Sequence, residues 1–191
     1  MDASGHPLRT TPAPPWRALV LCGLLALHLL GGSVRAETDV PREDRIKAVL
    51  IVKILKFVTW PAAVLPPRDA LTLCTLGDSA VALALSAADG RSIGERQILV
   101  RHLQTPTAPE GRSCHVLYTP ASFRDWPALV GAQRTRPILT IGDAPDFARK
   151  GGMIGLLRGE NRIGFEISPR TAREASLEIA APLLELATVV D

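Results

Sequence analysis

Short apolar segments that alternate with helical patterns are the feature of this sequence that most restricts its fold. Each is five to seven residues long and rich in Val, Ile and Leu, which is typical of buried strands. They cover residues 71–76, 97–103, 115–119 and 137–141. Helical patterns over 79–88 and 122–131 lie among them. This succession predicts an α/β fold of three layers, with a mostly parallel central sheet and helices on both faces.

A further helical pattern, over residues 43–59, precedes the first of these strands and ends at Trp60-Pro61, because a residue before proline avoids the α region. Its predicted inner face consists of Ile46, Leu50, Ile54, Phe57 and Val58. The opposite side carries basic residues, among which Val49 and Val52 intrude. We therefore expect most of the surface of this helix to be covered.

The C-terminal third begins with two apolar segments, 153–157 and 162–167. They flank the turn sequence Arg158-Gly159-Glu160-Asn161. This arrangement predicts an antiparallel hairpin, which we expect at the edge of the sheet.

Ser168 and Pro169 follow the hairpin and predict the N-cap and the first position of a last helix. The apolar face of that helix would be formed by Ala172, Ala175, Ile179, Leu183 and Leu186. Pro182 lies within it and should kink or shorten it.

The first 36 residues have the layout of a secretory signal peptide. Basic residues precede an apolar run from Ala18 to Leu30, and Val34 and Ala36 occupy the −3 and −1 positions of a cleavage site. The run is shorter than the roughly 18–20 residues that a transmembrane helix needs. We expect cleavage after Ala36, export to the periplasm, and one mature domain over residues 37–191.

The three cysteines divide between the leader and the mature domain. Cys22 lies inside the apolar run and follows Leu21, whereas a lipoprotein anchor needs a small residue before the cysteine. Cys74 and Cys114 remain after cleavage, and an even number in an exported protein predicts one disulfide. Cys74 lies in the first predicted strand and Cys114 enters the third, and such strands can be neighbours in a doubly wound sheet.

Composition excludes nucleic acid as a partner. The formal net charge is only +3 and aromatic residues make up 4% of the chain. A surface that binds nucleic acid needs a stronger basic field or aromatic side chains for stacking on bases.

Motifs that resemble catalytic sequences lack the context that catalysis needs. The pattern Gly90-Arg91-Ser92-Ile93-Gly94 follows a helix and precedes a strand, the reverse of a nucleophile elbow. Cys114 and His115 are adjacent on a strand and would point to opposite faces. The glycines at 151, 152 and 155 match no phosphate-binding loop. We expect no catalytic residues, no metal site and no cofactor.

An ordered set of short sequences runs through the mature chain. It comprises Lys56-Phe57-Val58-Thr59-Trp60-Pro61, Leu71-Thr72-Leu73-Cys74-Thr75-Leu76-Gly77, Cys114-His115-Val116-Leu117-Tyr118, Ile138-Leu139-Thr140-Ile141-Gly142-Asp143, Phe147-Ala148, Gly151-Gly152-Met153-Ile154, Arg162 with Phe165-Glu166-Ile167, and Ala172 with Leu183-Leu184-Glu185-Leu186-Ala187. The set resembles the YfiR/HmsC family of small periplasmic proteins. The resemblance implies a non-enzymatic domain that binds the periplasmic sensor region of an inner-membrane diguanylate cyclase, lowering cyclic di-GMP and biofilm formation.

We expect the partner surface on the edge hairpin and at the start of the last helix, around Arg162, Phe165, Glu166 and Arg173. Edge strands offer unpaired backbone groups to another chain. The alternative for Phe165 is a place in the core. A homodimer is a further expectation, with no surface assigned to it.

Two alternatives stay open at this point. The chain could instead be a receptor that binds a small ligand at the strand ends and signals to a membrane kinase or cyclase. The disulfide could be a redox switch, whose reduction releases the cyclase, or only a structural staple.

Overall fold

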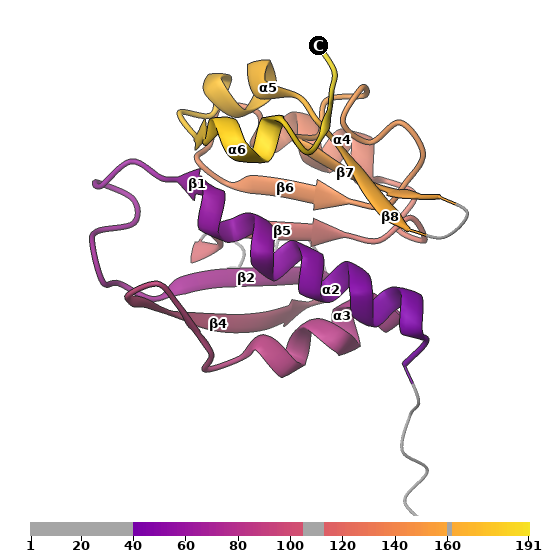
Figure 1. The fold of residues 1–191 in the computed structure, drawn as a ribbon, viewed down its shortest axis with the longest axis horizontal. Coiled ribbons are helices and arrows are strands. Elements are labelled where there is room, and N and C mark those ends of the chain that lie inside the picture. Colours follow the sequence, from indigo (N-terminus) through magenta and orange to yellow (C-terminus); the bar gives the residue numbers. More distant parts are fainter. Residues whose placement is uncertain (1–39, 105–112, 160–161) are drawn as a thin grey trace, which may run out of the picture. The chain divides into compact units, whose positions relative to one another are not determined.

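Strand β2 (Leu71–Leu76) occupies the centre of the fold, and all of its residues are buried. It pairs with a parallel neighbour on each side in an eight-stranded sheet (Figure 1). The structure is a computed structural model that describes residues 40–104, 113–159 and 162–191, which belong to one unit, Asp39–Asp191. The predicted signal peptide with its cleavage after Ala36, the loop 105–112 and the centre of the hairpin turn lie outside the described residues.

The other strands of the main sheet are β3 (Ser92–Ile93), β4 (Arg96–Leu103), β5 (Val116–Thr119), β6 (Leu139–Gly142), β7 (Ile154–Arg158), β8 (Ile163–Ile167) and β10 (Thr188–Val189). They lie in the order β10-β8-β7-β6-β5-β2-β4-β3. The pairs β2–β4, β2–β5, β5–β6, β6–β7 and β8–β10 are parallel, and β3–β4 and β7–β8 are antiparallel. The prediction of an α/β fold with a mostly parallel sheet is confirmed.

Helices cover both faces of this sheet and complete the three predicted layers. They are α2 (Arg42–Ile54), α3 (Ala80–Leu85), α4 (Trp126–Gln133), α5 (Pro169–Glu174) and α6 (Ala181–Leu184), with single 3₁₀ turns at Leu55–Phe57 and Ser86–Ala88. Alternate residues of β2 join different cores: Leu73 packs with the α2 and α3 side, and Cys74 with the α4 side. No helix within the described ranges is long and apolar enough to span a bilayer.

The connections that leave β2 and β5 run in opposite directions across the sheet. β2 continues through α3 to β4 on one side, and β5 continues through α4 to β6 on the other. Adjacent parallel strands whose connections diverge form a topological switch point, the place where open α/β sheets bind ligands. In this fold the switch point lies at the carboxyl ends of β2 and β5.

The predicted hairpin is confirmed, but its position differs from the expectation. β7 and β8 pair antiparallel from Ile154 opposite Ile167 to Arg158 opposite Ile163. The C-terminal segment then returns to the sheet, and β10 pairs with the end of β8. β10 is therefore the edge strand and β8 is second from the edge. The side chain of Val190, which follows β10, is buried and anchors the returning segment.

The single last helix predicted after Ser168 is wrong. α5 ends at Glu174, and Ser176 adopts a left-handed conformation with a φ of 59°, which stops a helix. The chain then forms β9 (Glu178–Ile179), which pairs antiparallel with β1 (Val58–Thr59), residues predicted as the last turn of the first helix. Pro182 lies in the first turn of α6, where its missing N–H is tolerated.

The predicted covering of the first helix is also wrong. Ile46 was expected in the inner face, and yet both Ile46 and Val49 are exposed. The buried residues of α2 are Ala48, Ile51 and Ile54. This inner stripe is centred on a different side of the helix because α2 rests on α3 as well as on the sheet.

Helix α4 begins later than the pattern over 122–131 predicts. Its first residue is Trp126, so Pro127 occupies the first turn instead of interrupting the helix. A proline there needs no N–H partner and has a φ suited to the helix.

The ring of Phe147 fills a slot that two glycines leave open. Phe147 is buried and packs on Trp126, with 4.8 Å between the ring centroids. A Cβ at Gly152 would lie 2.8 Å from the carbonyl oxygen of Phe147 and closer still to its ring, and a Cβ at Gly142 would also contact the ring. The glycine-rich segment before β7 therefore makes room for an aromatic side chain.

We expect Gly152→Ala to destabilise the fold by about 1–3 kcal/mol, because the added methyl group overpacks the slot around Phe147. The matched control is Gly131→Ala in α4, where a Cβ meets nothing within 4 Å. That substitution should stabilise the protein by roughly 0.5–1 kcal/mol through helix propensity. Urea unfolding of the two variants checks the difference, and equal effects would contradict the packing role of Gly152.

Candidate functional site

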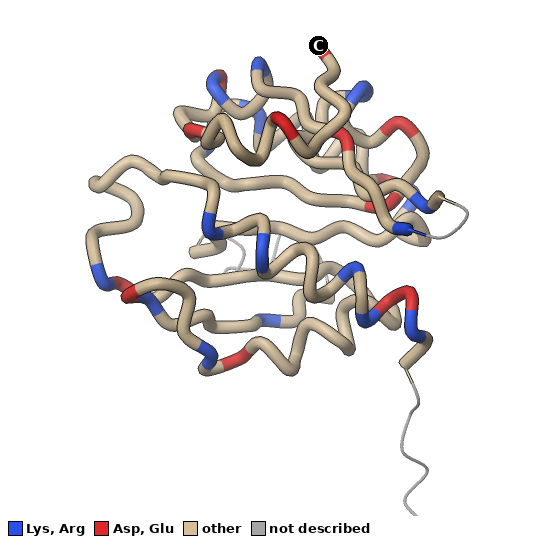
Figure 2. Tube along the Cα trace, in the orientation of Figure 1, with Lys and Arg blue, Asp and Glu red and all other residues tan. Residues whose placement is uncertain are grey.

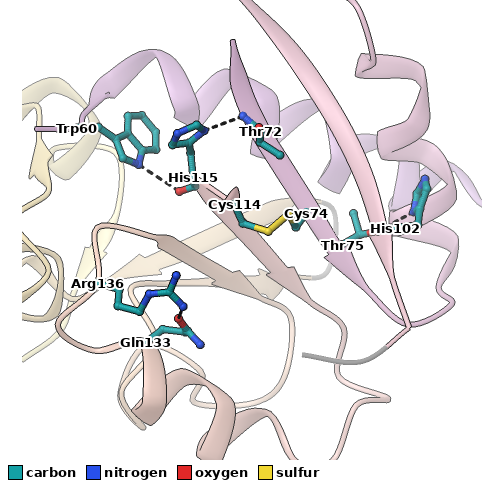
Figure 3. The surroundings of a disulfide bond; sticks show 9 residues. All are labelled: Trp60, Thr72, Cys74, Thr75, His102, Cys114, His115, Gln133 and Arg136. Atoms are coloured by element: carbon teal, nitrogen blue, oxygen red, sulfur yellow. Dashed lines mark hydrogen bonds between the residues drawn. A yellow bond between two sulfur atoms is a disulfide. The ribbon is translucent and has the colours of Figure 1, made fainter. Parts of the chain in front are cut away.

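A disulfide between Cys74 and Cys114 joins the two central strands (Figure 3). Cys74 lies in β2, and Cys114 immediately precedes β5, the parallel neighbour of β2. The Cα atoms are 5.8 Å apart, within the normal range for a disulfide, and both residues are buried. The predicted bond is present, which leaves neither residue as a free thiol.

The side chain of His115 ties the same two strands together at their amino ends. Its Nδ1 accepts a hydrogen bond from the Thr72 N–H at 2.9 Å, and the backbone N–H of His115 donates to the Thr72 carbonyl. The indole Nε1–H of Trp60 donates to the His115 carbonyl at 3.1 Å (Figure 3). Burial lowers the pKa of His115 and outweighs the hydrogen bond to the backbone of Val64, which acts in the opposite direction. The positive charge of Arg96 lowers this pKa further, and Asp69 has the smallest effect, which raises it.

His102 lies between two hydroxyl groups. Thr75 Oγ1 is 2.7 Å from its Nδ1, and Ser86 Oγ is 2.9 Å from its Nε2. A serine next to a histidine invites comparison with a catalytic triad. The third group here is a hydroxyl, however, which cannot stabilise an imidazolium as a carboxylate does. We therefore assign this set a structural role between β2, β4 and α3.

The remaining motifs with a catalytic pattern are also structural. Ser92 of the G-x-S-x-G sequence lies in the tight β3–β4 hairpin, and Gly90 and Gly94 have φ values of 70° and 58°. Within the described residues, no group of three or more His, Cys, Asp or Glu side chains could hold a metal ion. The hairpin position removes the strand-to-helix turn that a nucleophile elbow requires.

A charged cluster at the carboxyl edge of the sheet joins α2 to the end of β6. Lys47 Nζ lies 3.2 Å from Glu43 Oε1 and 3.2 Å from Asp143 Oδ2. Asp143 Oδ1 accepts a hydrogen bond from the Ala121 N–H at 2.7 Å. Burial disfavours the charge of Lys47, but Asp143 and Glu43 outweigh it and raise the pKa of Lys47. Lys47 therefore stays protonated and holds α2 in place.

Two buried hydroxyls near this cluster have no hydrogen-bond partner among the described residues. They belong to Tyr118 and Thr119, at the end of β5. Burial, together with the nearby Asp143 carboxylate, raises the pKa of Tyr118, which keeps its phenol neutral. Because adjacent strand residues point to opposite faces, the two hydroxyls belong to different layers. The hydroxyl of Tyr118 faces the side chains of Asp143 and Ser79, next to the switch point.

The four predicted partner residues divide into two pairs. Arg162 and Arg173 are exposed, before and after β8. Phe165 and Glu166 are buried, and Glu166 Oε1 accepts a hydrogen bond from Arg149 Nη2 at 2.8 Å. The structure therefore brings Arg162 and Arg173 to the surface and places the other two in the body of the sheet.

Apolar side chains are exposed close to the true edge of the sheet. Leu186 is 73% exposed and Val189, in the edge strand β10, is 51% exposed. Leu186 was predicted to lie on the inner face of the last helix, and that prediction is wrong, because α6 ends at Leu184.

The charged cluster of Lys47 and Asp143 was not predicted from the sequence. A pattern that could have indicated it is the sequence Gly-Asp, which follows two predicted strands, at Gly77-Asp78 and at Gly142-Asp143. Polar residues directly after parallel strands gather at the carboxyl edge of a sheet. No comparable pattern indicates Lys47, because it lies in a helix 96 residues before Asp143 in the sequence.

Replacing both Cys74 and Cys114 with serine should lower the free energy of unfolding by about 4 kcal/mol, as expected for a cross-link over a separation of 40 residues. Chemical denaturation of the variant, compared with the oxidised and the reduced wild type, measures this loss. An equally stable double variant would contradict a structural role of the bond.

Stability should fall as the pH drops below about 6.5, the ordinary pKa of histidine. The pKa of His115 is lowered in the folded state, so the unfolded state takes up the proton first, and the loss levels off below the folded-state pKa. His115→Asn, whose amide oxygen can accept the Thr72 N–H, should flatten this dependence in thermal unfolding between pH 7.5 and 5. His102→Gln is the control, and equal flattening in both variants would contradict the assignment.

The described residues thus hold a cross-linked strand pair, a partly buried charged cluster and an exposed edge, with no complete catalytic set among them. A family model described as YfiR/HmsC-like matches residues 44–188, which extend from α2 into β10. A comparison with curated proteins found no match. The match covers well over half of the sequence, and this chain therefore belongs to the YfiR/HmsC-like family, whose members are periplasmic regulators of diguanylate cyclase signalling.

Proposed function

We propose that this chain is a periplasmic repressor without enzymatic activity, which binds the periplasmic sensor region of an inner-membrane diguanylate cyclase. Binding lowers the production of cyclic di-GMP and restrains biofilm formation. The family match over residues 44–188 carries the proposal. Export with cleavage after Ala36 is part of it and is tested by mass spectrometry of the mature N-terminus.

The chemistry of the described residues supports binding over catalysis. Cys74 and Cys114 are consumed in a disulfide, and His115 is engaged with the backbone of the neighbouring strand. Nucleophilic catalysis needs a free nucleophile beside an oriented base. Ser86 beside His102 is the nearest approach to that arrangement, and it lacks a carboxylate.

The edge around β10 is the partner surface that we propose. β10 pairs with β8 on one side only, so its other side offers backbone groups to an added strand. The exposed side chains of Leu186 and Val189 supply apolar contact area beside it. The exposed guanidinium groups of Arg162 and Arg173 precede and follow β8 and supply charge. Phe165 and Glu166 are buried in β8, the strand that pairs with β10, and so contribute to this surface only by packing beneath it.

Leu186→Asp combined with Val189→Asp should raise cyclic di-GMP in cells that carry the partner cyclase. The protein level should stay unchanged, because substitutions at exposed positions cost less than about 0.5 kcal/mol. Val64→Asp, at a position 41% exposed in a distant loop, is the matched control. Full repression by the double variant would contradict an apolar partner edge, and Arg162→Glu with Arg173→Glu tests the charged part separately.

The role of the disulfide is decided by the same assay. If the bond is a redox switch, the double serine variant of Cys74 and Cys114 releases the cyclase even at conditions where the variant is folded. If the bond is a staple, the folded variant represses fully. Periplasmic protein level and melting temperature are measured alongside cyclic di-GMP, so that loss of protein is not mistaken for release.

A second candidate function, a receptor for a small ligand, is favoured by one observation. The buried hydroxyl of Tyr118 lies beside the Asp143 carboxylate at the switch point of the parallel sheet. A ligand bound there would exchange hydrogen bonds with the phenol and the carboxylate. A thermal-shift screen of amino acids and nucleotides, repeated with Tyr118→Phe, distinguishes this function, since a hit lost in the variant supports a receptor.

A further inference from the structure

The outer side of α2 carries a continuous row of basic and apolar side chains. This basic stripe is formed by Arg42, Arg45, Ile46, Val49 and Lys53 of α2 and by Lys56 of the 3₁₀ turn that follows, all of them exposed. At 100° per residue the five positions in α2 fall within a sector of roughly 100°, directly opposite the buried residues of the helix. The basic residues lie toward both ends of the stripe, and the two aliphatic residues lie between them.

The acidic residues of α2 do not share this stripe. Glu43 and Asp44 lie on other sides of the helix, where both contact Lys47 and Glu43 also pairs with Arg158. Figure 2 shows basic positions recurring along α2 and acidic positions confined to its beginning. The stripe therefore combines four positive charges with no negative charge from its own helix.

The middle of the stripe is apolar and open to solvent. Ile46 is 44% exposed and Val49 is 53% exposed. Leu83 of α3, the helix that α2 contacts, is also exposed, at 47%. A helix that presents aliphatic side chains among lysines and arginines is typical of segments that lie in the interface of a membrane.

We propose that the basic stripe binds the surface of an anionic phospholipid bilayer. The four cations would meet the phosphate groups of the lipids, while Ile46 and Val49 enter the boundary between headgroups and acyl chains. A second copy of the chain fits this surface poorly, because a symmetric contact would place four cations against four cations. Such binding would hold the protein at the membrane whatever protein partner it has there.

The experiment uses the mature chain, residues 37–191, and vesicles of phosphatidylcholine with or without 30 mol% phosphatidylglycerol, in a sedimentation assay. The wild type should bind the anionic vesicles and dissociate from them at high salt, and it should not bind vesicles of phosphatidylcholine alone. Lys53→Glu with Lys56→Glu should lower the partition coefficient at least about thirtyfold, because each basic residue near the surface contributes about 1 kcal/mol.

Matched variants separate the stripe from net charge. Arg101→Glu with Arg124→Glu makes the same change in charge at exposed positions away from α2 and should leave vesicle binding almost intact. Ile46→Ser with Val49→Ser should weaken binding while leaving its salt dependence in place. Equal loss in both charge variants would overturn the proposal, as would equal binding to neutral vesicles or no binding by the wild type.

Two further outcomes assign the stripe to another occupant and also overturn the proposal. A dimer in light scattering that Ile46→Ser with Val49→Ser dissociates would identify a second copy. Capture of the partner's purified periplasmic region by the wild type but not by the Lys53 and Lys56 variant, without vesicle binding, would identify a protein surface. Repression of the cyclase is read out separately as cyclic di-GMP, so failure of the lipid proposal leaves the proposed function standing.

Discussion

The parallel pairing of β2 with β5 is the interaction on which the rest of the domain depends. The disulfide of Cys74 and Cys114 fixes it covalently, and the ring of His115 adds a hydrogen bond to the backbone of β2. Because the chain leaves these two strands in opposite directions, the pair also divides the helices between the two faces. A change that parts β2 from β5 would disturb both layers and the switch point together.

The surfaces to which we assign interactions lie on separate elements around that centre. The basic stripe belongs to α2, and the exposed edge belongs to β10 and the residues that precede it. The partly buried cluster of Lys47 and Asp143 connects the inner side of α2 to the sheet. α2 is thus held by charge on its inner side, while the residues of its outer side are exposed to solvent. Each surface can be altered without touching the disulfide.

The features that could be predicted from sequence are those whose pattern is local. Strand β2 is a continuous apolar run, Ser168 and Pro169 mark a helix start, and the cysteines had one pairing after cleavage. β1, β9 and β10 were not predicted, because two-residue strands show no periodicity and form only when a distant partner is present. The exposed position of Ile46 was missed because aliphatic residues on several sides of a helix do not show which side is packed.

The pairing of β1 with β9 has a consequence for the order in which the domain closes. Val58 pairs with Ile179, and nearly the whole domain lies between them in sequence. Contacts of such long range form late, since the loop they close must first be ordered. The end of the first helix is therefore secured by residues that are synthesised long after the helix itself. A chain truncated before β9 would lack this strand pairing. The end of its first helix would then unfold locally more often, and proteases would cleave it there more readily.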